Sequence, residues 1–492
     1  MGMKRRDFCE TTLLGAIAAL PAFKARSASS AEVLSKIGDI PAVKLSGEPT
    51  TIPAAAVKDF AANFRGRLLT ANDPDYDQAR RIWNKMFDRR PALIARCSGA
   101  ADIQRAVAFS RERDLLVAVR GGGHSYPGYS TCNGGLVIDL SSMRSVRVEP
   151  MDKTAQAAGG ALIGDLDWET QQYGLATPMG TVSNTGIGGL TLGGGYGTLS
   201  RLYGLACDNL ISADLITAEA KLLRVSATEN PDLFWAIRGG GGNFGVVSSF
   251  EYRLHPVGPQ VLVGDLTYAP AQTRDVLQYC GEFVARAPRE LTVYISVRPD
   301  KAGALFPVLE VCFVGQPGSG EKVLQSLRAA TKPREENIRA LDYVKLQSQD
   351  DGPTLSDSAE YEKVGHVSEL TPALIDAIME ERRGLGLGFV GGAIADVAPT
   401  ETALAHRQEL FMLGMGAEWK DPAENEGKLA AVRAAWDKLS RFTTGFYANL
   451  TSTDQKSGDD NFGPNRTRLM ALKKQYDPGN LFRLNANIHP AE

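Results

Sequence analysis

The sequence has few of the residues that metal sites and disulfide frameworks require. Its 492 residues include only six cysteines and five histidines, and no two cysteines form a CxxC pair. Metal sites and disulfide scaffolds usually show short, regular Cys or His spacing, so we expect no metal site and at most one disulfide. The formal net charge is −3, which gives no reason to expect a nucleic-acid partner.

Long apolar runs are also scarce. The run Leu13–Leu20 is too short to span a membrane, and it follows the basic segment Lys4-Arg5-Arg6. This order is typical of a twin-arginine export signal, which we predict for residues 1–31; a basic, disordered tail is the alternative. We therefore expect the bacterial export machinery as a partner, a periplasmic or extracellular location, and no stable association with a membrane.

The remaining composition is that of a globular protein, with 43% hydrophobic and 23% charged residues. A chain of 492 residues is too long for one core, so two domains are expected.

The glycines of the sequence are concentrated in a few unusual clusters. The first cluster, Arg120–Tyr126, reads RGGGHSY and follows the apolar run Leu115–Val119, which resembles a buried strand. Three glycines let a backbone turn sharply and approach a bulky anion with its N–H groups. His124 then stands at the edge of that turn as a candidate base, ligand or nucleophile. A glycine-rich surface turn is the alternative.

A second cluster covers residues 180–209 and reads GTVSNTGIGGLTLGGGYGTLSRLYGLACDN. Nine of these thirty residues are glycine, yet aromatic and aliphatic residues are spaced among them. Glycine weakens both helices and strands, so the segment suits a backbone wrapped around a large polar ligand. A flexible linker fits less well, because it would lack the aromatic and aliphatic residues.

A third run, 240–245, satisfies GxGxxG but stands in the wrong context. It follows the helical stretch 233–237 and precedes the predicted strand 246–252, whereas a dinucleotide fingerprint needs the strand first. This order argues against a nicotinamide site.

Several motifs together resemble one family. They occur in the order RGGGHSYPGYS, GGLVIDLSSM, GTVSNTGIGG, DLFWAIRGGGGNFGVV, FYANL and NFGPNRTRLMALKKQYDPGNLFRLNANIHP. The chain resembles the berberine-bridge-enzyme-like FAD-linked oxidases of the vanillyl-alcohol-oxidase flavoprotein superfamily, over roughly residues 60–492. The resemblance implies a two-domain α+β, PCMH-type FAD-binding fold with an antiparallel sheet-and-helix substrate domain.

The same resemblance divides the chain. It implies an FAD-binding domain at 60–258, a substrate domain at 259–442, and a segment at 443–492 that completes the FAD-binding domain. In the middle part we expect strands at 261–266, 291–297 and 308–314, helices at 321–330, 372–384 and 426–442, and an acidic surface loop at 351–361.

FAD is the cofactor implied by the resemblance, and the family motifs carry its binding residues onto this chain. In the family, the histidine of RGGGHS is bonded to the 8α-methyl of the isoalloxazine, and His124 holds that position. Many members add a cysteine link to flavin C6, but Val182 stands at that position, so we expect a single link. The full set expected to bind FAD is Arg120, Gly121, Gly122, Gly123, His124, Ser125, Tyr126, Gly180, Thr181, Ser183, Thr185, Gly186, Gly188, Gly189, Gly194, Tyr196, Gly197, Asp208, Gly245, Val246, Val247, Asn449, Asn465 and Asn485.

Two residues are candidates for the base that takes a substrate proton while hydride leaves. Tyr447, in FYANL, matches the family's tyrosine near the flavin, and Asp396 matches a carboxylate that serves as base in some members. Thr185, three residues after Val182, matches the position next to flavin C4a, where oxygen reacts.

These expectations describe an exported FAD-dependent oxidase. It would oxidise a small-molecule alcohol, sugar or amine and pass the electrons to O2, giving H2O2. The alternatives are a dehydrogenase of the same fold with another acceptor and a flavin-carrying binding protein without turnover.

Overall fold

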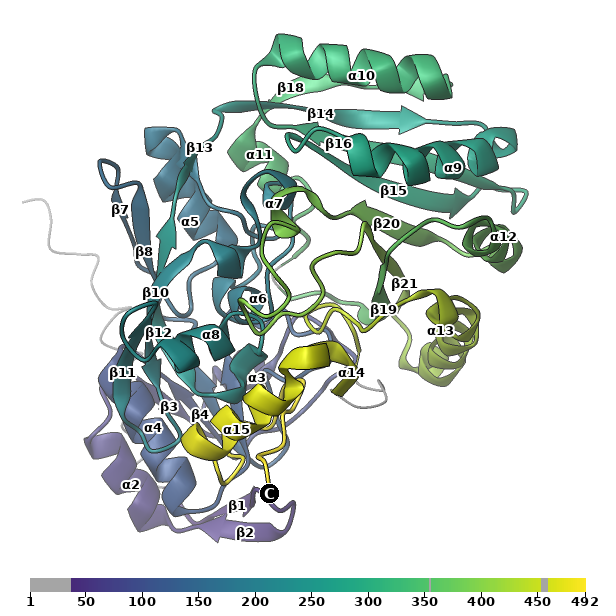
Figure 1. Ribbon diagram of the computed structural model, residues 1–492. Helices are drawn as coiled ribbons and strands as arrows, with labels where there is room; N and C mark the ends of the chain where they lie inside the picture. Colours follow the sequence, from purple (N-terminus) through teal and green to yellow (C-terminus); the bar gives the residue numbers. More distant parts are fainter. Residues whose placement is uncertain (1–36, 354, 453–458) are drawn as a thin grey trace, which may run out of the picture.

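The computed structural model describes residues 37–353, 355–452 and 459–492 (Figure 1). The predicted export signal at 1–31 lies outside these residues. Within them, no helix is both long and apolar enough to cross a membrane.

A small sheet with a parallel centre positions the first glycine cluster. Its strand order is β3-β4-β6-β5, and β6 pairs in parallel with both β4 and β5. Helix α4 connects β4 to β5, and the RGGGHSY turn begins where β5 ends, at the carboxyl edge where α/β sheets usually bind ligands. The bounds are β3 Arg67–Leu69, β4 Leu93–Arg96, α4 Ala100–Glu112, β5 Val117–Arg120 and β6 Leu136–Asp139.

A five-stranded antiparallel sheet lies beside it, in the order β11-β10-β12-β8-β7. Between β8 and β10 the chain forms short helices and loops that contain the second glycine cluster. The bounds are β7 Val146–Glu149, β8 Thr154–Ala158, α5 Ile163–Thr170, β9 Leu175–Ala176, α6 Ile187–Leu192, α7 Ser200–Tyr203, β10 Leu210–Ile216, β11 Leu222–Ser226, α8 Pro231–Ile237 and β12 Val246–Arg253.

The middle of the chain forms one large antiparallel sheet in the order β17-β14-β16-β15-β20-β21-β19, with β18 also paired to β14. Every strand of this sheet lies between residues 260 and 419, which supports the proposed division near residue 258. Its strands are β14 Gln260–Thr267, β15 Leu291–Pro299, β16 Leu305–Phe313, β17 Glu335–Glu336, β18 Arg339–Asp342, β19 Ala359–Val367, β20 Leu385–Phe389 and β21 Phe411–Trp419. Its helices are α9 Thr273–Phe283, α10 Pro317–Thr331, α11 Tyr343–Ser348, α12 Pro372–Glu381 and α13 Asn425–Leu439.

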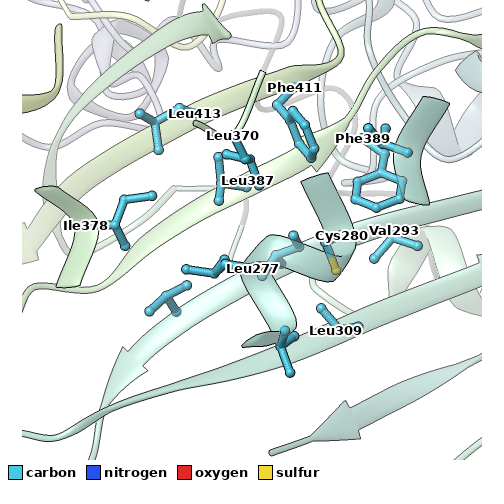
Figure 2. Packing of buried hydrophobic residues seen from close by; sticks show 14 of the residues in the cluster. Leu277, Cys280, Val293, Leu309, Leu370, Ile378, Leu387, Phe389, Phe411 and Leu413 are labelled. Atoms are coloured by element: carbon cyan, nitrogen blue, oxygen red, sulfur yellow. The ribbon is translucent and has the colours of Figure 1, made fainter. Parts of the chain in front are cut away.

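The large sheet has one apolar face, because side chains alternate along each strand. In β15, Val293 and Ile295 are fully buried on the helix side. Figure 2 shows strand residues of this face meeting helices α9 and α12. The residues labelled there are Leu277, Cys280, Val293, Leu309, Leu370, Ile378, Leu387, Phe389, Phe411 and Leu413. The helices thus cover this face, and the opposite face remains available for a site.

The C-terminal segment packs against the N-terminal half, which supports the proposal that residues 443–492 complete that half. Helix α15 (Arg466–Tyr476) runs beside α8 (Figure 1). Its Lys473 is fully buried and donates to the carbonyl of Asn243 at 2.7 Å and to Asp477 at 2.7 Å. The hairpin of β1 (Ile40–Val43) and β2 (Pro49–Ile52) and helix α2 (Ala54–Ala62) pack into the same core as β4, so residues before the expected start at 60 belong to this half.

The expected elements of the middle part are present, with ends that differ by a few residues. The exception is the segment 351–361, which we expected to be a surface loop. Its end belongs to β19, where Ala359 and Tyr361 are buried. The acidic residues of this strand face a cavity. In the sequence they therefore resemble the solvent-exposed residues of a loop.

Candidate active site

The two glycine clusters meet across one cavity of about 1030 Å³, which lies between the N-terminal half and the large sheet. Both halves and the C-terminal segment contribute to its wall. The residues expected to bind FAD that line it are Gly121, Gly122, Gly123, His124, Ser125, Tyr126, Gly180, Thr181, Thr185, Gly186, Gly188, Gly189, Tyr196, Gly197, Gly245, Val246, Val247, Asn449 and Asn485. Most of the expected set therefore shares one ligand-sized space.

Direct backbone contact explains why glycine is needed in both clusters. A Cβ added to Gly122 would lie 2.3 Å from the amide nitrogen of Gly186, so the two loops touch without side chains between them. Gly189, on α6, differs because a Cβ there would meet nothing within 4 Å, although the residue lines the cavity. The loops form a cradle whose open side is backbone, which fits a large phosphate-bearing cofactor such as FAD.

Three expected cofactor residues lie behind the cradle. Arg120 donates to the carbonyl of Ala79 and is absent from the cavity wall. The hydroxyl of Ser183 donates to Asp351, away from the space. Gly194, with φ of +118°, turns the chain after α6 and does not line the cavity.

Two polar residues of the expected set stabilise the scaffold. Asp208 forms an ion pair with the fully buried Arg407 at 2.6 Å. Asn465 donates to the carbonyls of Pro399 and Thr402 at 2.7 and 3.1 Å. Neither residue lines the cavity, so their contribution to binding would be indirect.

His124 lies where a bound ring could reach it. Its imidazole stacks on Trp83 with ring centroids 5.3 Å apart, and its Nδ1 lies 3.4 Å from the hydroxyl of Thr185. Its Nε2 is buried without a hydrogen-bond partner among the described residues. Burial lowers the pKa of His124 to about 4, against a smaller opposing effect of Asp351, so the imidazole is neutral at neutral pH.

Tyr447 is a buried phenol that receives several hydrogen bonds. Its oxygen accepts from the amide of Asn449 at 2.9 Å and from the backbone N–H groups of Gly195 and Tyr196 at 3.1 and 3.4 Å. Burial raises the pKa of Tyr447 above its usual value, while these donors lower it. Three donors around one oxygen would favour the phenolate form whenever a proton leaves.

Asp396 lies elsewhere. It forms a bidentate ion pair with Arg289, with N–O distances of 2.6 and 2.8 Å, and its side chain is 55% exposed. It does not line the cavity. This placement argues against the base role expected for Asp396 and leaves Tyr447 as the candidate.

The GxGxxG run occurs in the expected reversed context. It follows α8 and leads directly into β12, and its glycines Gly240, Gly241, Gly242 and Gly245 line the cavity. The run therefore belongs to the same cradle and does not form a separate dinucleotide site.

The sequence reasoning missed the residues that the large sheet contributes. Tyr294, Glu310, Glu360, Glu362 and Glu418 project from its face opposite the helices, and all five line the cavity. The alternation in 291–297 and the Glu-Tyr-Glu spacing at 360–362 were the available signals, but they do not show which strands are neighbours.

The fold and the cavity define a flavin-binding enzyme with two halves, one cradling the cofactor and one facing it with a sheet. Models of known families match accordingly: an FAD binding domain at residues 91–226 and a berberine and berberine-like segment at 446–489. The chain belongs to the berberine-bridge-enzyme-like FAD-linked oxidoreductases, as the resemblance implied.

Individual relatives agree with this assignment. An uncharacterised FAD-linked oxidoreductase of Bacillus subtilis is 32% identical over 86% of this chain and 97% of its own. The glucooligosaccharide oxidase of Sarocladium strictum is 29% identical over 84% of this chain and 90% of its own. The crystal structure of 6-hydroxy-D-nicotine oxidase from Arthrobacter nicotinovorans has a TM-score of 0.80 and 28% identity, and covers 87% of this chain and 98% of that one.

Proposed function

We propose that the protein is an FAD-linked oxidase of a small alcohol, sugar or amine. The observation that carries this proposal is that a neutral buried imidazole and a hydrogen-bonded phenol, His124 and Tyr447, line the same glycine cradle. Relatives named as oxidases of oligosaccharides and of 6-hydroxynicotine support the reaction class.

Bound FAD would supply the redox chemistry, which is acceptance of a hydride from the substrate carbon and transfer of two electrons, with two protons, to O2 to give H2O2. The protein's own part is to bind and orient. Backbone N–H groups of the glycine loops would hold the phosphates, and the enclosed wall would keep the substrate against the ring.

His124 is the proposed covalent anchor. A neutral nitrogen could bond to the 8α-methyl carbon as one C–H bond of that methyl and the imidazole N–H bond are lost, with O2 taking up the two electrons and two protons. The pKa of about 4 keeps this imidazole neutral. Val182 lines the cavity at the second-link position and has no thiol, so we propose a single link. Acid precipitation should leave yellow protein in the wild type and release the flavin from His124→Ala. A cysteinyl-flavin peptide in mass mapping would contradict the single link.

Tyr447 would take the proton of the substrate hydroxyl or amine as the hydride leaves. To accept a proton, Tyr447 must first be a phenolate. The donors from Asn449, Gly195 and Tyr196 stabilise the negative charge on its oxygen. The rings of Tyr196 and Tyr447 pack edge to face, with centroids 5.0 Å apart and an interplanar angle of 88°. This packing restricts the orientation of the phenol.

We also propose that the protein is exported, on the twin-arginine segment at 5–6 alone. Replacing both arginines by lysine should retain the protein in the cytoplasm of its bacterial host.

The function is tested by anaerobic mixing of the holoenzyme with alcohols, sugars and amines, followed by air. Loss of the visible absorbance of the oxidised flavin, and its return in air with formation of H2O2, would support an oxidase. Bleaching without rapid return would indicate a dehydrogenase. No bleaching by any compound would favour a flavin-carrying binding protein.

A further inference from the structure

The cavity-facing side of the large sheet carries a group of carboxylates that the proposed reaction does not use. Glu360 and Glu418 are direct cross-strand partners on β19 and β21, and Glu362 follows on the same face of β19. All three line the cavity. Like charges directly opposite each other destabilise a sheet. Packing therefore gives no reason for placing two glutamates at this pair of positions.

Within residues 37–353, 355–452 and 459–492, no basic side chain neutralises these three carboxylates. Among the described residues, no hydrogen bond or ion pair reaches the side chains of Glu360, Glu362 or Glu418. Glu310, on the same sheet face, provides a contrast because Arg298 and Ser296 bond to it at 2.7 and 2.9 Å. The acidic patch, defined as Glu360, Glu362 and Glu418, therefore presents carboxylates to the cavity that have no basic partner among the described residues.

Burial raises the pKa of Glu360 to about 7, with a further contribution from Glu418. Burial and Glu360 raise the pKa of Glu362 to about 7 in the same way. A cation placed among these groups would lower both values and release protons.

Aromatic rings border the acidic patch. Tyr294 lines the cavity and keeps 41% of its surface exposed, and the hydroxyl of Tyr126 has no partner in the described part of the chain. Trp83 stands 5.2 Å from the Tyr126 ring and 5.3 Å from the His124 ring. Electron-rich ring faces beside carboxylates are the surroundings that organic cations prefer.

Strands β20 and β21 carry four glycines on the face of the sheet that bears these carboxylates. Gly386 and Gly388 on β20 and Gly414 and Gly416 on β21 share the cavity face, because Gly386 pairs with Gly414 and Glu362 pairs with Gly416. A Cβ added to Gly414 would lie 3.2 Å from the Glu362 carboxylate, which therefore extends over these glycines. A Cβ added to Gly386 would collide with the Tyr294 hydroxyl, so the glycines make room for the Tyr294 and Glu362 side chains, which both line the cavity.

The acidic patch is close to the proposed base. The backbone N–H of Tyr447 donates to the carbonyl of Val364 at 3.3 Å, and Val364 follows Glu362 by two residues on β19. Two residues along a strand span about 6.6 Å, so the backbones of the two groups are near each other. Glu362 and Tyr447 also line the same cavity, so a substrate within it can contact both.

We propose that the substrate is an organic cation, whose ammonium group binds among Glu360, Glu362 and Glu418 against the rings of Tyr126 and Tyr294. The ammonium is either remote from the oxidised carbon or gives its proton to a carboxylate before hydride leaves, because a protonated nitrogen opposes loss of hydride from its neighbour. This assignment rests on the proposed oxidase function and narrows its substrate class to amines.

The test uses three probes with the flavin-loaded protein at pH 8: benzylammonium, benzyl alcohol and the neutral disaccharide cellobiose. Binding is followed by the shift of the flavin spectrum and independently by calorimetry. Benzylammonium should bind at least ten-fold more tightly than benzyl alcohol, and cellobiose should bind most weakly. Equal affinities for the first two, or tighter binding of cellobiose, would overturn the proposal.

Two variants separate charge from shape. Glu362→Gln should weaken benzylammonium at least ten-fold and change benzyl alcohol by less than about three-fold, whereas the matched Glu310→Gln should have a much smaller effect because Arg298 already balances that charge. Glu360→Gln should keep or raise the melting temperature, since it removes the repulsion from Glu418. Unchanged benzylammonium affinity in Glu362→Gln refutes the assignment.

The outcomes also distinguish this proposal from the oxidase function. If benzylammonium bound preferentially but no compound bleached the flavin, the oxidase function would be refuted and the cation site would be supported. Bleaching by neutral sugars, with no preference for the cation, would keep the oxidase and refute the cation site.

Discussion

The hydrogen bonds at Tyr447 allow its proposed role as a base to be tested. Asn449 donates to the phenol oxygen at 2.9 Å, the shortest of the three donors, and to the carbonyl of Leu190 at 3.0 Å. Replacing Asn449 by leucine keeps a similar side-chain size and removes this donor. The phenol remains in place with the two backbone donors.

The size of the effect follows from the charge on the phenolate. A hydrogen bond to a charged group contributes about 1.5–3 kcal/mol. At about 1.36 kcal/mol for each pKa unit, the pKa of Tyr447 should rise by about 1–2 units. Burial already holds this pKa above its usual value, so only a small fraction is ionised at neutral pH. Each further unit should therefore lower the rate of flavin reduction about ten-fold, for a total of about 10–100-fold.

The assay is anaerobic stopped-flow reduction of the holoenzyme at a series of pH values. In Asn449→Leu the rate should fall at neutral pH, recover as pH rises, and show its basic transition displaced upward. Tyr447→Phe is the reference, because it should lose about 10²–10⁴-fold at every pH and show no such transition. If Asn449→Leu changed only the flavin content, or if Tyr447→Phe kept the wild-type rate, Tyr447 would not be the base.

Two further predictions concern the cradle. Thr185→Leu should slow the reoxidation of reduced enzyme by air, because a larger side chain would close the path of a small molecule beside His124 without filling the substrate space; stopped-flow mixing with O2 measures this, and an unchanged rate would refute it. Gly189→Ala should lower the FAD content while keeping or raising the melting temperature of the apoprotein, since alanine favours a helix and its Cβ meets no protein atom. Gly122→Ala is the contrast and should lower both, because its Cβ would collide with Gly186. Full FAD content in Gly189→Ala would place the cofactor elsewhere.

The cofactor half could be predicted from the sequence because its signal is local. Three consecutive glycines before His124, or a helix before a GxGxxG run, can be recognised within ten residues. The same local reading cannot separate a residue that faces the ligand from one that holds the loop. Asp208 and Asn465 stand within or beside the motifs, yet they bond to Arg407 and to backbone carbonyls behind the cavity.

The substrate half could not be predicted in this way because its site depends on strand register. Glu360 and Glu418 are 58 positions apart in the chain and become neighbours only through the pairing of β19 with β21. The carboxylate of Glu360 also made the start of a buried strand resemble a surface loop. Asp396 shows the converse error, since a carboxylate at a plausible motif position is paired with Arg289 outside the cavity.

The alternation of the large sheet explains how such a site can exist without loss of the fold. Val293 and Leu387 are buried against helices, whereas their neighbours Tyr294 and Gly388 face the cavity. Stability comes mainly from the first set, because buried apolar area dominates the free energy of folding. The second set can then hold glycines and unpaired carboxylates at a modest cost. Glu362→Gln should therefore affect recognition far more than stability.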